Sequence, residues 1–343
     1  MRKQMKRFKI AYIILAHNQP NLLKRLISQL NVEGSTIFIV HWDRKKKIKE
    51  LESLKCITSN IYLVEERVDG VWGGISLVKA TLNAIKEMLR LEFSFDYAVL
   101  LSGQDYPVKD NQFIFDFFQY SEGNLYMEIF NQFNCTKEWQ KIVFSDRLGC
   151  YNLILETDWY RLREDKQRES LEKRVISKQG DNSQWKLIFD DDIVRRLKHK
   201  FRGCSFPRQL PPATIEGKET KLIAWGGSQW WALPYDAVNY IDNFVKENPQ
   251  YYDFHKFTFI PDEIFFQTII MNNPEFSRRV INHRLKYLDW SRDIKPMVFN
   301  DEYLNYFTSI CLNPFFLFAR KFETETSNNI LNQIDTLLNN EKY

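Results

Sequence analysis

Short apolar runs alternate with amphipathic segments over the first hundred residues. Four of these runs are rich in β-branched side chains, which predicts buried strands of a parallel sheet. They span residues 9–17, 35–43, 61–64 and 96–101. Leucine and isoleucine recur at helical spacing after Pro20 and again over residues 73–91, so helices are predicted between the strands. This order predicts a doubly wound, mostly parallel α/β sheet flanked by helices, with ligands at the carboxyl ends of its strands.

The pattern becomes less regular from about residue 122 to residue 222. Charged residues dominate positions 161–174, which are predicted to form an exposed helix. A further central strand is predicted at 225–233, and helices are predicted after Pro234 and Pro261. The chain is therefore expected to form one domain over 1–324 with an insertion at 122–222. A loosely attached helical tail is expected at 325–343.

The composition is that of a folded protein with a large core. Of the 343 residues, 44% are hydrophobic and 15% are aromatic. The aromatic excess suits stacking on sugars as well as core packing. A net charge of +4 without a dense basic stripe argues against nucleic-acid binding. The five cysteines form no CxxC pair, and the histidines lack ligand spacing, which argues against a disulfide framework and structural zinc.

The amino terminus is basic but carries no signal-peptide pattern. Its cations are Arg2, Lys3, Lys6, Arg7 and Lys9. The apolar run at 11–16 is too short to span a bilayer, so a cytoplasmic protein is expected. The basic residues would either form a solvated tail or touch anionic lipid at the inner face of the membrane.

Polar residues gather where the predicted strands end. His17 follows the first strand, His41 and Asp43 lie at the end of the second, and Asp105 follows the fourth. Because these ends meet at one edge of the sheet, the residues are predicted to line a nucleotide site. Asp43 could accept hydrogen bonds from a base or a ribose. A local, turn-stabilising role explains Asp105 equally well.

Two segments combine glycine with tryptophan. Trp72-Gly73-Gly74 precedes a predicted helix and indicates either a backbone that approaches an anion or a tight helix entry. Three tryptophans fall within positions 225–231, more than a buried strand needs, which favours a platform for an acceptor sugar over simple core packing. Trp230 and Trp231 would face opposite sides of a strand, so only one of them is predicted to touch a sugar.

Two acidic segments each allow two interpretations. Pro261-Asp262-Glu263 has the composition of an ordinary helix start, yet Glu263 could also act as a general base on a sugar hydroxyl. Asp190-Asp191-Asp192 is a literal DxD, the motif with which metal-dependent sugar transferases bind Mn²⁺ or Mg²⁺. It precedes a helical pattern rather than following a strand, which favours helix capping. No metal site is therefore predicted.

Cations flanked by aromatic residues recur near the end of the chain. Such cations often lie at the surface. If they fold back over the sheet edge, they would instead neutralise a departing diphosphate. They are Arg292, Lys295, Arg320 and Lys321.

Seven segments, in this order, resemble the core-2/I-branching β-1,6-N-acetylglucosaminyltransferase family, which includes the peptide O-xylosyltransferases. They read AYIILAHNQ, FIVHWD, VWGGISLVKATLNAI, LLSGQDYPVK, GSQWWALP, PDEIFFQTII and LFARKF. The resemblance runs from about Ala11 to Phe322 and implies a glycosyltransferase-A-like, Rossmann-like fold without the metal-binding DxD. Animal members have a membrane anchor, a lumenal stem and disulfides, none of which this sequence shows, so a bacterial-type member is expected.

The resemblance also implies roles for individual residues. Glu263 takes the position of the base in an inverting, single-displacement transfer. Lys321 and either Lys295 or Arg292 take the positions of the two cations that hold the donor's diphosphate. The remaining expected contacts are His17, Asp43, Asp105 and Arg320 on the donor side, and Glu128, Ser228, Trp230 and Trp231 on the acceptor side.

The expected function is transfer of a sugar, GlcNAc from UDP-GlcNAc, to a saccharide acceptor of capsule or lipopolysaccharide, with neither cofactor nor metal. UDP-xylose and UDP-glucose are alternative donors. A third hypothesis is a non-catalytic carbohydrate-binding protein on the same fold. The presence of Glu263 together with the late cations argues against that hypothesis.

Overall fold

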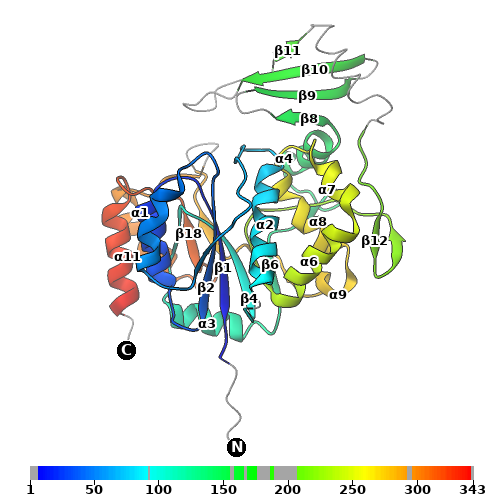
Figure 1. Cartoon of the computed structure of the whole chain (residues 1–343). Coiled ribbons are helices and arrows are strands. Elements are labelled where there is room, and N and C mark those ends of the chain that lie inside the picture. Colours follow the sequence, from blue (N-terminus) through cyan, green and yellow to red (C-terminus); the bar gives the residue numbers. More distant parts are fainter. Residues whose placement is uncertain are drawn as a thin grey trace, which may run out of the picture.

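A seven-stranded sheet forms the centre of the molecule (Figure 1). The computed structural model describes residues 7–91, 93–154, 158–165, 168–175, 186–188, 207–291 and 296–340. The strand order is β16-β6-β15-β4-β1-β2-β3. The strands are β1 (Ile10–Ala16), β2 (Thr36–Trp42), β3 (Ile61–Leu63), β4 (Tyr97–Ser102), β6 (Leu125–Met127), β15 (Trp231–Pro234) and β16 (Val280–Ile281).

Most neighbouring strands of this sheet run parallel. β1 lies between β2 and β4 and is parallel to both, and β2 is parallel to β3. β15 is the exception, because it runs antiparallel to β4 and to β6. The predicted doubly wound, mostly parallel α/β sheet is confirmed.

Helices cover both faces of the sheet, which explains why its strands are apolar at successive positions. Ile10, Tyr12 and Ile14 of β1 pack into one core, whereas Ala11 and Ile13 pack into the other. The first core is covered by α1 (Pro20–Leu30), α3 (Asn111–Gln119), α10 (Leu304–Leu312) and α11 (Asn328–Asn340). The second is covered by α2 (Ser76–Arg90), α6 (Tyr235–Glu247) and α8 (Phe265–Met271). α1 and α11 lie on the opposite side of the sheet from α2 and α6 (Figure 1).

A three-stranded sheet continues from the carboxyl end of β4. It has the order β17-β18-β5, with β5 (Asp105–Pro107), β17 (Lys286–Leu288) and β18 (Phe318–Arg320). Its register sets Arg320 opposite Asp105. Residues from the middle and the end of the chain therefore meet beside the main sheet.

The carboxyl-terminal helix α11 is firmly docked, contrary to the expectation of loose attachment. Ile330, Leu331 and Ile334 are buried in the first core. Asp335 accepts hydrogen bonds from Arg25 Nη2 of α1 at 2.7 Å and from the Tyr106 hydroxyl of β5 at 2.6 Å. α11 thus ties α1 to the three-stranded sheet.

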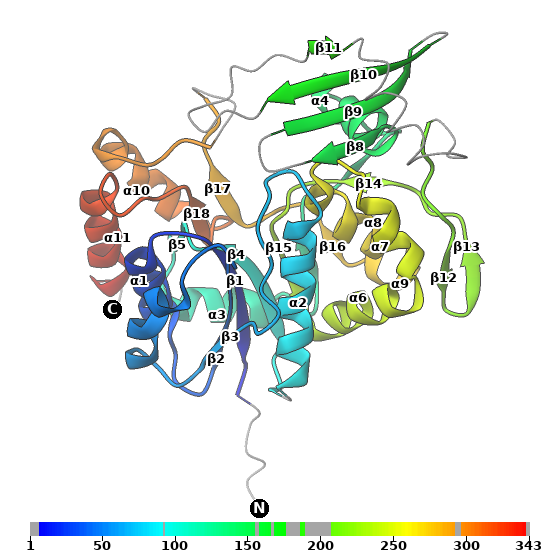
Figure 2. The ribbon, with the colours of Figure 1, turned by 45° about the horizontal axis from the view of Figure 1, so that its top comes forward.

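The predicted helix over 161–174 is wrong. The segment forms strands β9 (Asp158–Asp165) and β10 (Arg168–Val175), which pair antiparallel between β8 (Tyr151–Ile154) and β11 (Lys186–Ile188). Their register sets Arg161 opposite Glu172 and Asp165 opposite Arg168. This four-stranded sheet stands beyond the carboxyl ends of the central strands (Figures 1 and 2).

The strand predicted at 225–233 is interrupted. β14 (Trp225–Gly226) pairs with β7 (Phe130–Asn131) in a separate ribbon, and only β15 joins the central sheet. The break contains Gly227, where a Cβ atom would lie 1.7 Å from the Glu128 carbonyl oxygen. This close backbone approach explains why a glycine interrupts the apolar run.

Within the described ranges, no helix combines the length and the apolar character needed to cross a bilayer. Residues 190–192, with the literal DxD, lie outside the described residues, as do Arg292 and Lys295.

Candidate active site

Glu263 lies in a short turn rather than in the first turn of a regular α-helix. The turn η3 (Pro261–Glu263) ends before Ile264, and α8 starts at Phe265. Glu263 Oε2 lies 2.7 Å from Arg147 Nη1, and the glutamate side chain is 33% exposed. Burial raises the pKa of Glu263, and the charge of Arg147 opposes that shift. The carboxylate is thus recessed, held in one orientation and still open to solvent.

Arg147 was not predicted from the sequence. It comes from the short π-helix η2 (Val143–Leu148) within the irregular region. Its guanidinium carbon lies 5.7 Å from the centre of the Phe259 ring, and its carbonyl accepts a hydrogen bond from Phe259 N at 3.1 Å. A single arginine in an irregular segment carries no pattern that could reveal this pairing.

A second carboxylate–arginine pair lies beside the first. Glu128 Oε2 lies 2.8 Å from Arg284 Nη1. Gly227 connects the two pairs, because its N–H donates to the Glu263 carbonyl at 2.8 Å and its backbone touches that of Glu128. Both members of the second pair act on Glu263, since Glu128 raises its pKa and Arg284 lowers it.

A cavity of about 410 Å³ opens at this second pair. Its walls combine charged and aromatic side chains, which can bind the hydroxyl groups and the apolar C–H faces of a sugar. They include Glu128, His283, Arg284, Lys286, Tyr287 and Phe316.

The two predicted platform tryptophans are both buried. Trp231 is 1% exposed and packs against Phe266 in the second core. Trp230 is 6% exposed, and Lys286 Nζ lies 3.3 Å from the centre of its ring. Ser228 accepts a hydrogen bond from Gln267 Nε2 through its carbonyl, at 2.6 Å. A sugar contact at Trp230 or Ser228 stays a prediction, whereas Trp231 is enclosed by the core.

His17 shares the carboxyl-terminal edge of β1 with a group of charged residues. Burial lowers its pKa, Asp43 opposes this shift, and Arg320 and Lys321 lower the pKa further. These four residues are therefore electrostatic neighbours at the end of β1. Lys321 Nζ also lies 2.9 Å from Glu323 Oε1, with 27% of the lysine side chain exposed.

Asp43 and His41 organise the loops at the end of β2. Asp43 accepts hydrogen bonds from Gly70 N at 3.0 Å and from Lys45 N at 2.8 Å. His41 Nε2 accepts from Val68 N at 3.0 Å, and burial lowers the His41 pKa to about 4, so the ring is neutral at physiological pH. A nucleotide contact by Asp43 stays a prediction alongside this structural role.

Asp105 is fully buried and serves as an internal counter-ion. It accepts from Ser102 N at 2.8 Å, and its oxygens lie 2.5 Å from Lys286 Nζ and 3.2 Å from Arg320 Nη1. Its own oxygens are buried, and Arg320, with which it pairs, is the partly exposed member of the pair. The hydrogen bond from Ser102 N matches the alternative prediction that Asp105 stabilises the turn after β4.

The glycines after Trp72 form a tight helix entry. Gly73 has a φ of +76°, and a Cβ atom there would lie 2.5 Å from the Phe259 ring. Its carbonyl accepts from Ile260 N at 2.8 Å, directly before η3. These contacts support the interpretation of this segment as a tight helix entry rather than as a backbone that approaches an anion.

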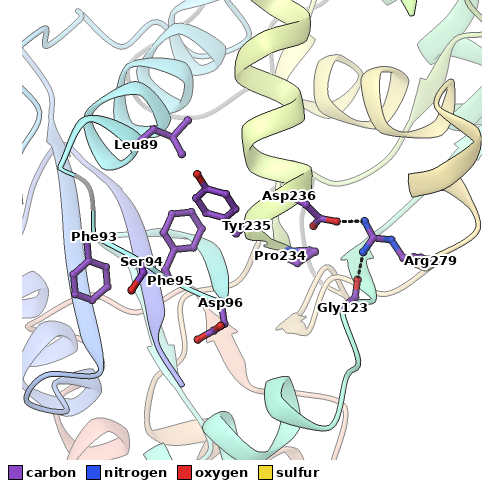
Figure 3. A pocket seen from close by; sticks show the side chains of 10 residues that line it. All are labelled: Leu89, Phe93, Ser94, Phe95, Asp96, Gly123, Pro234, Tyr235, Asp236 and Arg279. Carbon is purple, nitrogen blue, oxygen red and sulfur yellow. Dashed lines mark hydrogen bonds and ion pairs between the residues drawn. The ribbon is translucent and has the colours of Figure 1, made fainter. Parts of the chain in front are cut away.

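A cavity of about 590 Å³ lies at the opposite, amino-terminal edge of the sheet. Figure 3 shows its walls, where Arg279 bridges Asp236 and the Gly123 carbonyl. Asp96 precedes β4, and Pro234 ends the antiparallel β15, which locates this edge. None of the predicted site residues lines this cavity.

Among the described residues, no three His, Cys, Asp or Glu side chains form a cluster that could hold a metal ion. Metal independence is a property of the reaction and not of these side chains alone, so it stays a prediction.

A doubly wound sheet with a recessed carboxylate and cations at its carboxyl-terminal edge has the architecture of an α/β protein that binds a nucleotide or a related anion there. The chain belongs to the Core-2/I-Branching enzyme family, whose model matches residues 10–306. The family resemblance is thereby confirmed.

Similar curated proteins are xylosyltransferases. The chain is 22% identical to xylosyltransferase 1 of Homo sapiens over 352 residues, which covers 96% of this chain and 30% of the relative. It is 24% identical to xylosyltransferase 2 of Mus musculus over 294 residues, which covers 83% of this chain and 27% of the relative. The chain thus spans less than a third of the length of these relatives.

One similar solved structure is a mutant UDP-glucose pyrophosphorylase from Leishmania major in complex with UDP-glucose. It is 8% identical and aligns over 70% of this chain and 52% of that one, with a TM-score of 0.26. A TM-score this low does not indicate a shared fold.

Proposed function

We propose that this protein is an inverting glycosyltransferase that moves GlcNAc from UDP-GlcNAc to a saccharide acceptor without a metal ion. The observation that carries the proposal is the pairing of Glu263 with Arg147, next to the turn that binds Gly73 before α2. Arg320 and Lys321 lie near His17 at the end of β1. Membership of the Core-2/I-Branching enzyme family supports it.

The residues divide the reaction between them. Glu263 takes the proton from the acceptor hydroxyl, whose oxygen then attacks the anomeric carbon of the donor. The bond from that carbon to the UDP oxygen breaks on the opposite face, so the configuration inverts. Arg320 and Lys321 neutralise the charge that develops on the departing diphosphate.

The cavity beside Glu128 and Arg284 is the proposed acceptor site. Its charged pair offers both hydrogen-bond donors and acceptors, and a sugar hydroxyl needs both kinds of partner. Glu128 also influences Glu263 electrostatically, so an acceptor in this cavity would lie close to the base. We assign Ser228 and Trp230 to the acceptor side of the site as well.

A second candidate keeps the reaction and changes the donor to UDP-xylose. The names of the similar xylosyltransferases favour it. UDP-glucose is a further possible donor for the same site. For either donor we place the protein in the cytoplasm, with its basic amino terminus available to the inner face of the membrane.

A thermal-shift screen with UDP-GlcNAc, UDP-xylose, UDP-glucose and GDP-mannose tests the proposal. A ligand stabilises the folded protein by an amount that grows with the logarithm of its concentration over its Kd. We expect UDP-GlcNAc to give the largest shift, GDP-mannose to give none, and slow hydrolysis of UDP-GlcNAc to follow. A larger shift and faster hydrolysis with UDP-xylose would support the second candidate. If no UDP-sugar shifted the melting temperature or was hydrolysed, the proposal would be contradicted.

A further inference from the structure

A buried charge cluster joins the end of β4 to the three-stranded sheet. Its centre is Asp105, which is 0% exposed, and Lys286, which is 1% exposed at its side chain. Asp105 Oδ2 lies 2.5 Å from Lys286 Nζ, and Asp105 Oδ1 lies 3.2 Å from Arg320 Nη1. Arg320 also donates to the Ser102 hydroxyl. One carboxylate therefore meets two cations.

The charges of this cluster do not cancel. When Lys286 is protonated, the state that its ion pair with Asp105 favours, one carboxylate balances one of the two cations and a single positive charge remains. Lys286 is enclosed, whereas the Arg320 side chain is 18% exposed, so Arg320 is the cation that can meet an external anion. Without Lys286, Arg320 would be the one cation left within ion-pair distance of Asp105 among the described residues. Because an uncompensated buried charge is costly, Asp105 would then hold Arg320 more strongly.

Trp230 supports both cations. Lys286 Nζ lies 3.3 Å and Arg320 Cζ lies 5.1 Å from the centre of its ring. An indole attracts cations, and a desolvated contact of this kind strengthens the attraction. Burial lowers the pKa of Lys286 to about 7, and Asp105 opposes that shift by favouring the charged form. The register of β18, with Arg320 opposite Asp105 and Leu288, fixes the arrangement.

We propose that Lys286 is a positioning residue. It neutralises Asp105, so that the positive charge of Arg320 is not balanced by Asp105 and remains available to the donor's diphosphate. The inference rests on the proposed function, because it requires a diphosphate at Arg320. Lys286 would act through Arg320, without contact between its own ammonium group and the donor.

Calorimetric binding of UDP and uridine to the full chain tests this role without an acceptor. Lys286→Met should weaken UDP binding about 10- to 100-fold, the range for losing one charge-assisted hydrogen bond. Uridine, which lacks the diphosphate, should bind as it does to the wild type. Lys286→Arg, which keeps the charge, should bind UDP within a few-fold of the wild type.

Two further variants separate charge balance from general damage to the fold. In Asp105→Asn/Lys286→Met no buried carboxylate remains to occupy Arg320, so UDP binding should return toward the wild-type value. In an Arg320→Ala background, Lys286→Met should cost little more UDP affinity, because the residue through which it acts is already absent. In a Lys321→Ala background, the full effect of Lys286→Met should remain. If Lys286→Met alone fails to fold, the double variant with Asp105→Asn provides the decisive comparison with wild type.

Wild-type UDP affinity in Lys286→Met, or equal losses of affinity for UDP and uridine, would overturn the inference. Independent effects of Lys286→Met and Arg320→Ala on UDP affinity would also overturn it. So would weak UDP binding in Asp105→Asn/Lys286→Met. A folded wild-type protein that binds no UDP would overturn the proposed function as well. Wild-type UDP binding that does not respond to Lys286→Met would overturn this inference alone.

Discussion

Glu263 lies between opposing electrostatic influences. Burial and Glu128 raise its pKa, whereas Arg147 and Arg284 lower it. A general base works best when its pKa lies near the pH at which the enzyme operates, because it must be deprotonated and still accept a proton. The two neighbouring carboxylate–arginine pairs supply charges of both signs, and the balance between these charges sets the pKa of Glu263.

Glu263→Gln keeps the size of the side chain and its ability to accept a hydrogen bond from Arg147, but it cannot take up a proton. We expect UDP binding to persist and transfer to fall by roughly 10²- to 10⁴-fold, the usual contribution of general-base catalysis. Single-turnover transfer and UDP titration measure the two properties separately. Near-normal turnover in this variant would remove Glu263 from the mechanism.

Arg147→Met should move the acid limb of the pH profile of kcat/KM to higher pH. Arg147 stabilises the charged carboxylate, so its removal raises the pKa of Glu263 further. Because the base is active only when deprotonated, activity is then lost at a higher pH as the solution is acidified. Arg147→Lys should shift the limb less, since it keeps a positive charge. An unchanged limb in Arg147→Met would show that the pair does not set the pKa of the base.

Among the elements, those buried on both faces were predictable. β1 and β2 are apolar at successive positions because a core lies on each side of them, and no surface strand needs such a run. The charged segment 161–174 gave no such signal. Its strands are defined by pairing with each other and with β8 and β11, and cross-strand pairing cannot be read from one segment alone.

The candidate site was predictable only in part for a similar reason. Glu263 and Lys321 lie within continuous segments that resemble the family. Arg147, Arg284 and Lys286 lie outside those segments, and each pairs with a carboxylate more than a hundred residues away in the sequence. Their partners are defined by the fold and not by local sequence.

Gly227→Ala should disrupt the element that joins the two carboxylate–arginine pairs. The new Cβ atom would lie 1.7 Å from the Glu128 carbonyl oxygen, so one of two backbone segments must move. We expect a loss of about 1–3 kcal/mol or more in the free energy of unfolding, as for overpacked cores. Urea unfolding measures this loss.

Gly217→Ala provides the matched control. It replaces a glycine with a φ of +75° that has no neighbouring atom within 4 Å, so only backbone strain opposes the substitution. It should cost about 1 kcal/mol. Equal losses in the two variants would show that the contact with Glu128 is unimportant.

At the scale of the whole molecule, the site combines residues from both ends of the chain. His17 follows the first strand, and Lys321 follows β18. α11 lies beside α1 (Figure 1). It links these regions, because Asp335 binds Arg25 of α1 and Tyr106 of β5, and Tyr106 pairs with Ala319 beside Arg320. The cations thus come from a part of the fold that the carboxyl-terminal helix holds in place.

Activity in the presence of a chelator tests the central claim, a transfer assisted by cations of the protein. A metal would act on the leaving diphosphate as a Lewis acid, and side-chain cations can replace it where water is excluded. We predict undiminished transfer from UDP-GlcNAc in excess EDTA, and a loss of about 2–4 kcal/mol of transition-state stabilisation in Lys321→Ala. Activity that EDTA abolishes and Mn²⁺ or Mg²⁺ restores would contradict the account.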